Sequence, residues 1–262
     1  SSSNIEHPPV RAMMPGDHLQ LLYNLWLTSD MIVGETPMGA NPYEFNTGDD
    51  EARQNLVGPD YIPGVLLFAA GHVLGGQSLG WNLMHFVLLW LSYLFTWLLV
   101  RSFVRHPWLS ALIALVGVTL PYRWMVLLGG SPSGYAMAWP PLFFYGVERL
   151  VRRDRWWGGV LAGVALLFSQ WNDAHVFFFG FLAVPAWGLA LLATRGDFDG
   201  KSARDWRRLV LASLPMLVIV AALVVRVLLG GMVAPDATEP HAAVAEEGRT
   251  LAEIAVFSPE PR

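Results

Sequence analysis

The chain has 262 residues, of which 54% are hydrophobic and only 15% are charged, and its formal net charge is −4. Soluble domains carry about a quarter charged residues, so this composition excludes an ordinary soluble enzyme and indicates an integral membrane protein. The lack of cysteine excludes disulfides, iron–sulfur clusters and thiol catalysis, and no basic stripe indicates nucleic-acid binding.

Residues 1–60 are predominantly polar, and we predict an extracytoplasmic loop that contains one interfacial helix at about 17–30. Asp17 stands at the start of this helix, where with Gln20 it resembles a capping box. The first residues have no charged region followed by an apolar region, so no signal peptide is predicted and we expect a fragment of a longer protein. The helix is predicted to lay one apolar face on the membrane, formed by Leu19, Leu22, Tyr23 and Trp26.

Residues 61–76 are apolar, but a run of this length is more typical of an interfacial or re-entrant segment than of a crossing. Longer apolar runs follow it, and they predict an all-α fold, a polytopic transmembrane bundle at 61–229 with a truncated extracytoplasmic loop at 230–262. The six predicted crossings are 78–103, 107–122, 135–148, 157–170, 175–193 and 208–229.

Lys and Arg residues are concentrated in alternate connections between these crossings. The connections after the first, third and fifth crossings hold eleven of the 17 basic residues, whereas 123–134 and 171–174 hold only Arg123. The positive-inside bias therefore predicts that the basic connections lie in the cytoplasm. The N-terminal segment, the connections 123–134 and 171–174, and the tail from 230 would then share the outer face.

This topology would bring candidate site residues from three distant segments to one membrane surface. A carboxylate there could accept a proton from an attacking hydroxyl, and an arginine could bind a phosphate group through its planar fork. Asp17 and Asp173 are the predicted catalytic carboxylates. The predicted substrate-binding residues are His18, Tyr122, Arg123, Trp171, Asn172 and His175.

Each of these residues also has a purely structural interpretation. Asp17 could serve only as a helix cap, and Arg123 could be an interfacial anchor. Asn172 and Asp173 could be turn formers between two antiparallel helices. No HxxxH or HExxH spacing occurs, so no metal ligands are predicted, although a divalent cation is left open. His85 lies in an apolar run, where a histidine is more often satisfied by a neighbouring group than by a metal.

The segments "GDHLQLLYNLWL", "NPYEF", "LPYRW" and "WPPLFFYGVERLVRR", in this order, resemble bacterial polytopic membrane proteins related to the C-type glycosyltransferases. The resemblance covers about 13–195. It implies an enzyme of the bacterial inner membrane that transfers a sugar from a polyprenyl-phosphate donor to an acceptor outside the cytoplasm. It further implies that Asp17, in the first outer loop, is the catalytic carboxylate and that Asp173 is a second one.

The chain departs from that pattern at one point, because the acidic pair usual in the first outer loop is here Asp17 followed by His18. A non-enzymatic membrane transporter or an assembly protein for envelope polymers is the alternative. The predicted partners are a lipid-linked sugar donor and membrane lipids.

Overall fold

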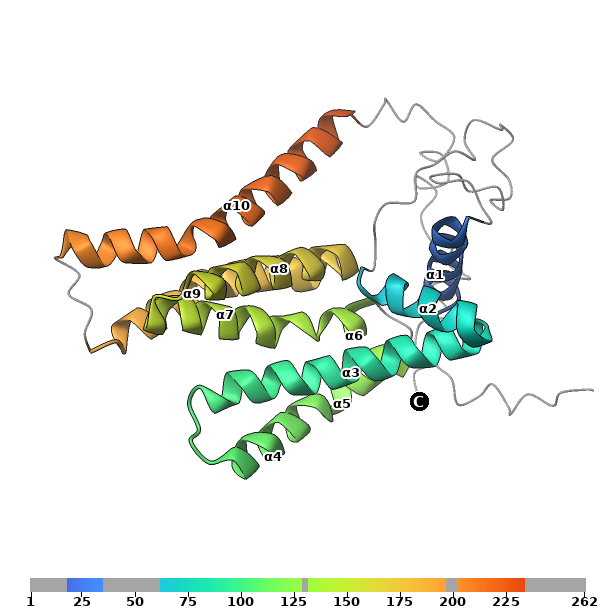
Figure 1. Ribbon diagram of the computed structural model, residues 1–262, viewed down its shortest axis with the longest axis horizontal. Helices are drawn as coiled ribbons and strands as arrows, with labels where there is room; N and C mark the ends of the chain where they lie inside the picture. Colours follow the sequence, from blue (N-terminus) through green and yellow to red (C-terminus); the bar gives the residue numbers. More distant parts are fainter. Residues whose placement is uncertain (1–17, 35–61, 129–131, 197–201, 234–262) are drawn as a thin grey trace, which may run out of the picture. The chain divides into compact units, whose positions relative to one another are not determined.

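The computed structural model describes residues 18–34, 62–128, 132–196 and 202–233. The described structure is helical throughout, without a strand, which confirms the predicted all-α class (Figure 1). The chain divides into two units, 1–220 and 221–262, and the helices described below belong to the first, except that the last one, Ala203–Val233, extends into the second. Asp17, a predicted catalytic residue, lies outside the described residues.

The N-terminal part contains α1 (His18–Val33), α2 (Gly64–Gly75) and α3 (Gln77–Arg101). Only Gly76 separates α2 from α3, and its φ of 82° lies in the left-handed region that glycine adopts without strain. The two helices touch backbone to backbone, because a Cβ on Gly71 would lie 2.6 Å from the Cα of Gly80. The predicted non-crossing segment 61–76 is thus one short helix folded back on α3.

The predicted helix at about 17–30 is present as α1, and its place at the membrane interface stays a prediction. Leu21 and Leu25 lie in the hydrophobic core, whereas Leu22 and Trp26 only pack against that core and are partly buried. The reason is that α2 covers α1, so tertiary packing selects the inward face of the helix. Leu22 and Trp26, two residues of the predicted membrane-facing side, are the partly buried ones, and their contact with a membrane stays a prediction.

Prolines divide the middle of the chain into α4 (Pro107–Val118), α5 (Pro121–Leu128), α6 (Pro132–Ala136) and α7 (Trp139–Arg153). The predicted crossing 107–122 is therefore not one helix, since α4 ends at Val118 and α5 begins at a proline. Proline suits the first turn of a helix, where its missing N–H has no partner to lose. For the same reason Pro140 and Pro141 lie in the first turn of α7 and do not kink a continuous helix.

The remaining helices are α8 (Trp156–Asn172), α9 (Ala174–Ala193) and α10 (Ala203–Val233). The most buried of the helices is α7, which packs on α3, α8 and α9. Its closest neighbour is α8, because a Cβ on Gly146 would lie 2.6 Å from the carbonyl oxygen of Gly158. Small residues thus set the distance between these two helices.

Among the described residues, three helices are long and apolar enough to cross a membrane, which indicates an integral membrane protein. They are α3, α9 and the part of α10 from Ala203 to Val225, and only 17%, 11% and 11% of their most apolar windows are buried. Their outward faces are therefore rich in apolar side chains, as lipid-facing helices require. The predicted crossings at α4–α5, α6–α7 and α8 are formed by shorter or interrupted helices, so six crossings stay a prediction.

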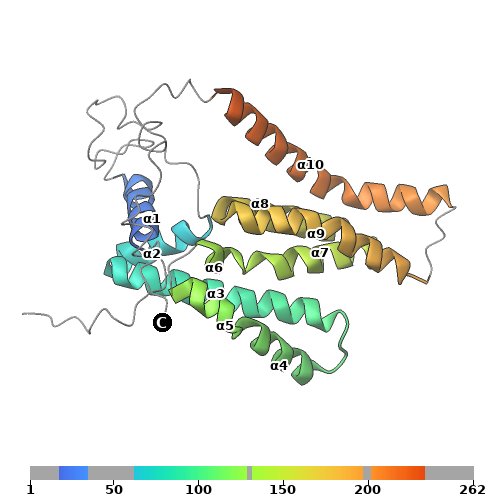
Figure 2. The same cartoon turned by 180° about the vertical axis from the view of Figure 1, so that it is seen from behind.

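The connections rich in basic residues meet at one end of the helices. Arg152, near the end of α7, lies over the ring of Phe103, 5.0 Å from its centroid, and donates to Thr194 Oγ1 at 3.0 Å. The ends of α3, α7 and α9 are thereby joined, and Figures 1 and 2 show them on the same side. We call this the basic end, formed by 102–106, 154–155 and 194–196 with the start of α10.

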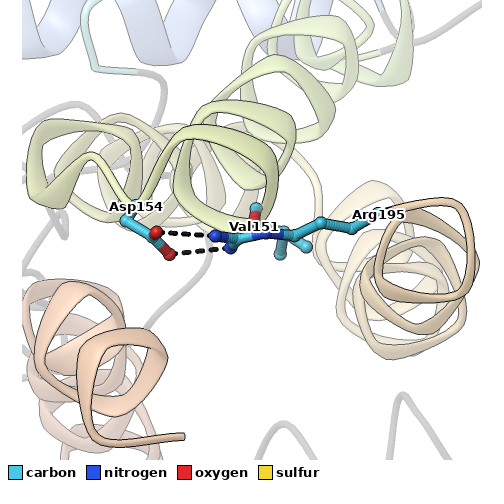
Figure 3. A network of polar contacts seen from close by, with 3 residues as sticks. All are labelled: Val151, Asp154 and Arg195. Atoms are coloured by element: carbon cyan, nitrogen blue, oxygen red, sulfur yellow. Dashed lines mark hydrogen bonds and ion pairs between the residues drawn. The ribbon is translucent and has the colours of Figure 1, made fainter. Parts of the chain in front are cut away.

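At the basic end an ion pair joins the connection after α7 to the connection after α9 (Figure 3). Asp154 ends α7 with a left-handed φ of 49° and accepts two hydrogen bonds from Arg195, at 2.8 and 2.7 Å. Arg195 also donates to the carbonyl of Val151 at 2.5 Å. The guanidinium therefore binds both a carboxylate and one of the last carbonyls of α7, where a cation is favoured.

Candidate functional site

The turn between α8 and α9 lies at the end opposite the basic end and holds four of the predicted site residues. Asn172 is buried, and its Nδ2 donates to the carbonyl of Ile62 at 2.9 Å and to that of Phe168 at 2.7 Å. Ile62 is the first described residue after the N-terminal segment. The amide of Asn172 thus joins the place where that segment enters the bundle to the α8–α9 turn, across 110 residues of sequence.

Asp173 is the N-cap of α9. Its Oδ1 accepts from the backbone N–H of His175 at 2.7 Å and lies 3.1 Å from Nδ1 of the same residue. The Asp173 side chain is only 7% exposed, whereas that of His175 is 89% exposed. The structure is therefore compatible with Asp173 as a helix cap and with Asp173 as a catalytic residue. A capping carboxylate can also act on a ligand indirectly, by holding the exposed imidazole of His175 that contacts the ligand.

Arg123, in α5, is 6% exposed and donates from Nη1 to Oγ of Ser92 on α3. Its Nε has no hydrogen-bond partner, and no carboxylate of the described residues forms an ion pair with it. Burial lowers the pKa of Arg123 to about 10, so the guanidinium keeps its charge at neutral pH. A buried cation without a counter-charge is costly, which makes Arg123 suited to bind an anion.

Tyr122, which precedes Arg123 in the sequence, does not point into the helix bundle. Its side chain is 63% exposed, and successive residues of a helix point in directions about 100° apart. The "PYRW" motif was predicted to supply both residues to one site. Only Arg123 is directed into the bundle.

A second buried polar contact joins α3 to α6 and was not predicted. His85 Nδ1 lies 2.7 Å from the carbonyl of Trp81, and its Nε2 lies 2.5 Å from the hydroxyl of Tyr135. A carbonyl can only accept, so Nδ1 carries the proton and Nε2 accepts from Tyr135.

These two contacts approach the same side of α3. His85 and Ser92 are seven residues apart, which places them on one face of the helix, two turns from each other. Tyr135 and Arg123 therefore bind two polar residues on the same face of α3, which we call the polar stripe of α3. Sequence reasoning treated His85 as satisfied by a neighbour, which is confirmed, but the partner is 50 residues away and had no local signal.

The other predicted residues are placed as follows. His18 is the first residue of α1, and its side chain lies outside the described part. The ring of Trp171 packs on Phe168, with centroids 5.9 Å apart, and its Nε1 is buried without a hydrogen-bond partner. In the described part of the chain no three His, Asp or Glu side chains are close enough to hold a metal ion.

The fold and these contacts define the class of the chain as a helical integral membrane protein with a buried arginine and two hydrogen-bonded polar contacts on one helix face. Comparison with models of known families, with curated proteins and with solved structures finds no match.

Proposed function

We propose that the protein is a membrane glycosyltransferase that moves a sugar from a polyprenyl-phosphate donor to an acceptor outside the cytoplasm. The observation that carries the proposal is the bond from Asn172 to the carbonyl of Ile62, because it holds the end of the N-terminal segment beside the turn that carries Asp173. The sequence places Asp17 in that N-terminal segment. The basic end would face the cytoplasm, and the α8–α9 turn the outer side.

The residues then have distinct roles. Asp17 is the general base that accepts the proton of the acceptor hydroxyl, and Asp173 orients that hydroxyl through the exposed His175. Arg123 neutralises the phosphate of the donor. As the acceptor oxygen forms its bond to the sugar carbon, the bond between that carbon and the phosphate oxygen breaks, and the polyprenyl phosphate leaves with the bonding electrons. His18, Trp171 and Asn172 complete the surroundings of the sugar and the lipid.

The buried guanidinium of Arg123, which forms no ion pair with a carboxylate of the described residues, favours this proposal over a protein that only anchors a polymer. A non-enzymatic assembly protein has no need for a desolvated cation, which destabilises the fold unless an anion binds it. An ion-coupled transporter would place several ionisable groups along its crossings. Away from the three residues at each end, the predicted crossings hold no charged residue or histidine except His85 and Arg226, and Glu148, at the end of one crossing, lies 3.3 Å from Arg149.

The test offers radiolabelled polyprenyl-phosphate sugars to the purified full-length protein with an envelope-polymer acceptor. We expect transfer by the natural protein, loss of transfer in Asp17→Asn, and unchanged transfer in Asp50→Asn, which removes a carboxylate from the same N-terminal segment. Membrane insertion of each variant is measured alongside. Full transfer by Asp17→Asn would refute the assigned base, and donor binding without any transfer would support the assembly protein instead.

A further inference from the structure

An open pocket of about 370 Å³ lies at the basic end, between the start of α8 and α10. Its lining residues are Asp154, Trp156, Arg208, Leu211 and Ala212. None of them belongs to the proposed glycosyl-transfer site, and all lie in the first unit of the chain. The pocket combines a cation, an exposed indole and apolar side chains.

A close helix contact fixes the shape of this pocket. A Cβ on Gly159 would lie 2.6 Å from the carbonyl oxygen of Ala212, so the backbones of α8 and α10 touch there. Gly163 continues the contact, since a Cβ on it would lie 2.6 Å from Cδ1 of Ile219. The two helices are therefore held together directly beside the pocket, which gives it a defined floor.

The charge of the pocket is positive although an aspartate lines it. Both carboxylate oxygens of Asp154 accept from Arg195, so its charge is already neutralised (Figure 3). Arg208 is exposed and forms no ion pair with a carboxylate of the described residues. An anion that enters the pocket meets an unpaired guanidinium next to a carboxylate whose charge is cancelled.

An apolar surface begins at the pocket and runs along α10 away from its charged start. Leu211 and Val218 are seven residues apart and share one helix face, and both are exposed, with Leu214 between them. Trp156 is 63% exposed at the opposite wall. Arg208 lies five residues after the start of a candidate crossing, which is the depth at which lipid headgroups meet basic and aromatic side chains.

We propose that this pocket binds an anionic phospholipid, with the headgroup phosphate on Arg208, the glycerol against Trp156 and an acyl chain along Leu211, Leu214 and Val218. Arg208 supplies charge and hydrogen bonds to the phosphate, while the apolar face of α10 selects a lipid over a free anion. The proposal depends on the membrane location of α10 and is independent of glycosyl transfer.

The experiment measures lipid binding to the delipidated, purified full chain by native mass spectrometry. Phosphatidylglycerol is compared with phosphatidylcholine, and Arg208→Gln with Arg207→Gln, which removes the same charge one residue away and outside the pocket. We expect a preference for phosphatidylglycerol, about fivefold weaker binding of it in Arg208→Gln, and a change below about twofold in Arg207→Gln. Arg208→Lys keeps the charge and retains most of the binding.

Three results would overturn the proposal. Equal losses in both glutamine variants would indicate diffuse attraction to the basic end and no site. Equal binding of the two lipids would remove the role of the anionic headgroup. Displacement of phosphatidylglycerol by millimolar inorganic phosphate would assign the pocket to free anions. Helical content measured by circular dichroism confirms that each variant is folded.

Discussion

The hydroxyl of Tyr135 donates to Nε2 of His85 across 2.5 Å, and the ring of Trp81 contacts both side chains. The Trp81 ring lies 4.4 Å from the imidazole, centroid to centroid, and the Trp81 carbonyl binds the other ring nitrogen. Every hydrogen-bonding atom of this imidazole is thus occupied. The contact therefore fixes the imidazole and ties α6 to α3.

Replacement of Tyr135 by Phe removes the donor and leaves Nε2 of His85 buried without a partner. We expect a loss of about 1 kcal/mol of unfolding free energy, seen as a melting temperature lowered by about 2–4 °C in detergent. Tyr122→Phe is the matched control, because that hydroxyl belongs to an exposed side chain. Equal melting temperatures for both variants would mean that the contact does not contribute to stability.

The ion pair at the basic end predicts that Asp154 and Arg195 are energetically coupled in the folded protein. Asp154→Asn keeps a residue that tolerates the left-handed φ of 49° and removes only the charge. Because the Arg195 side chain is 10% exposed, its loss of a partner is expected to cost about 1–2 kcal/mol.

The measurement is a double-mutant cycle with Arg195→Gln on the thermal unfolding of the purified protein. The double variant should lose less stability than the sum of the two single variants. Arg153→Gln, an exposed arginine without an ion pair among the described residues, is the control. Strict additivity would show that the pair is energetically independent.

The glycine contact between α7 and α8 predicts opposite effects for two Gly→Ala changes. Gly146→Ala places a methyl group 2.6 Å from the carbonyl oxygen of Gly158, so the helices must separate, at a cost of about 1–3 kcal/mol. Gly188→Ala meets only Val147 Cγ1 at 3.9 Å and removes a flexible residue from α9, so its unfolding free energy should rise by about 0.5–1 kcal/mol. Chemical unfolding of both variants distinguishes them, and a shared sign would contradict the packing described.

We expect that Arg123→Met leaves the stability of the protein intact but weakens its binding of the donor phosphate. An apolar side chain of similar length replaces a buried cation that has no counter-charge among the described residues, so the unliganded protein should be as stable as the natural one or more so. Binding of polyprenyl phosphate, measured by isothermal titration, should fall at least tenfold. Arg123→Lys, which keeps the charge but not the planar fork, should give an intermediate affinity. Unfolding of Arg123→Met under native conditions would instead make Arg123 a structural residue.

The sequence was sufficient to locate most helices, because apolar runs bounded by Gly, Pro and charged residues are local signals. The ranges 78–103, 157–170 and 175–193 were predicted to within a few residues of α3, α8 and α9. The break between Val118 and Pro121 was missed because the apolar run continues through it. Hydropathy does not record the φ restriction and the missing N–H that make Pro121 the start of a new helix.

The candidate site was less predictable than the fold. Alternating charge correctly indicated that the basic connections share one end, which the contacts of Arg152 confirm. It could not show that Arg123 is buried and Tyr122 exposed, since that depends on the rotation of α5 against α3. The contact between His85 and Tyr135 depends on the packing of α6, which no local pattern records. The assignment of Asp17 stays a prediction.

Because only Gly76 separates α2 from α3, the N-terminal helix α1 is connected to α3 through α2. Ser29 Oγ of α1 lies 3.3 Å from His72 Nδ1 of α2, and α2 is locked against α3 by the contact of Gly71 with Gly80. These contacts attach α1 through α2 to the first half of α3, which also carries His85 and its hydrogen bond with Tyr135. A substitution in α1 that displaces α2 is therefore expected to disturb the polar stripe of α3 as well.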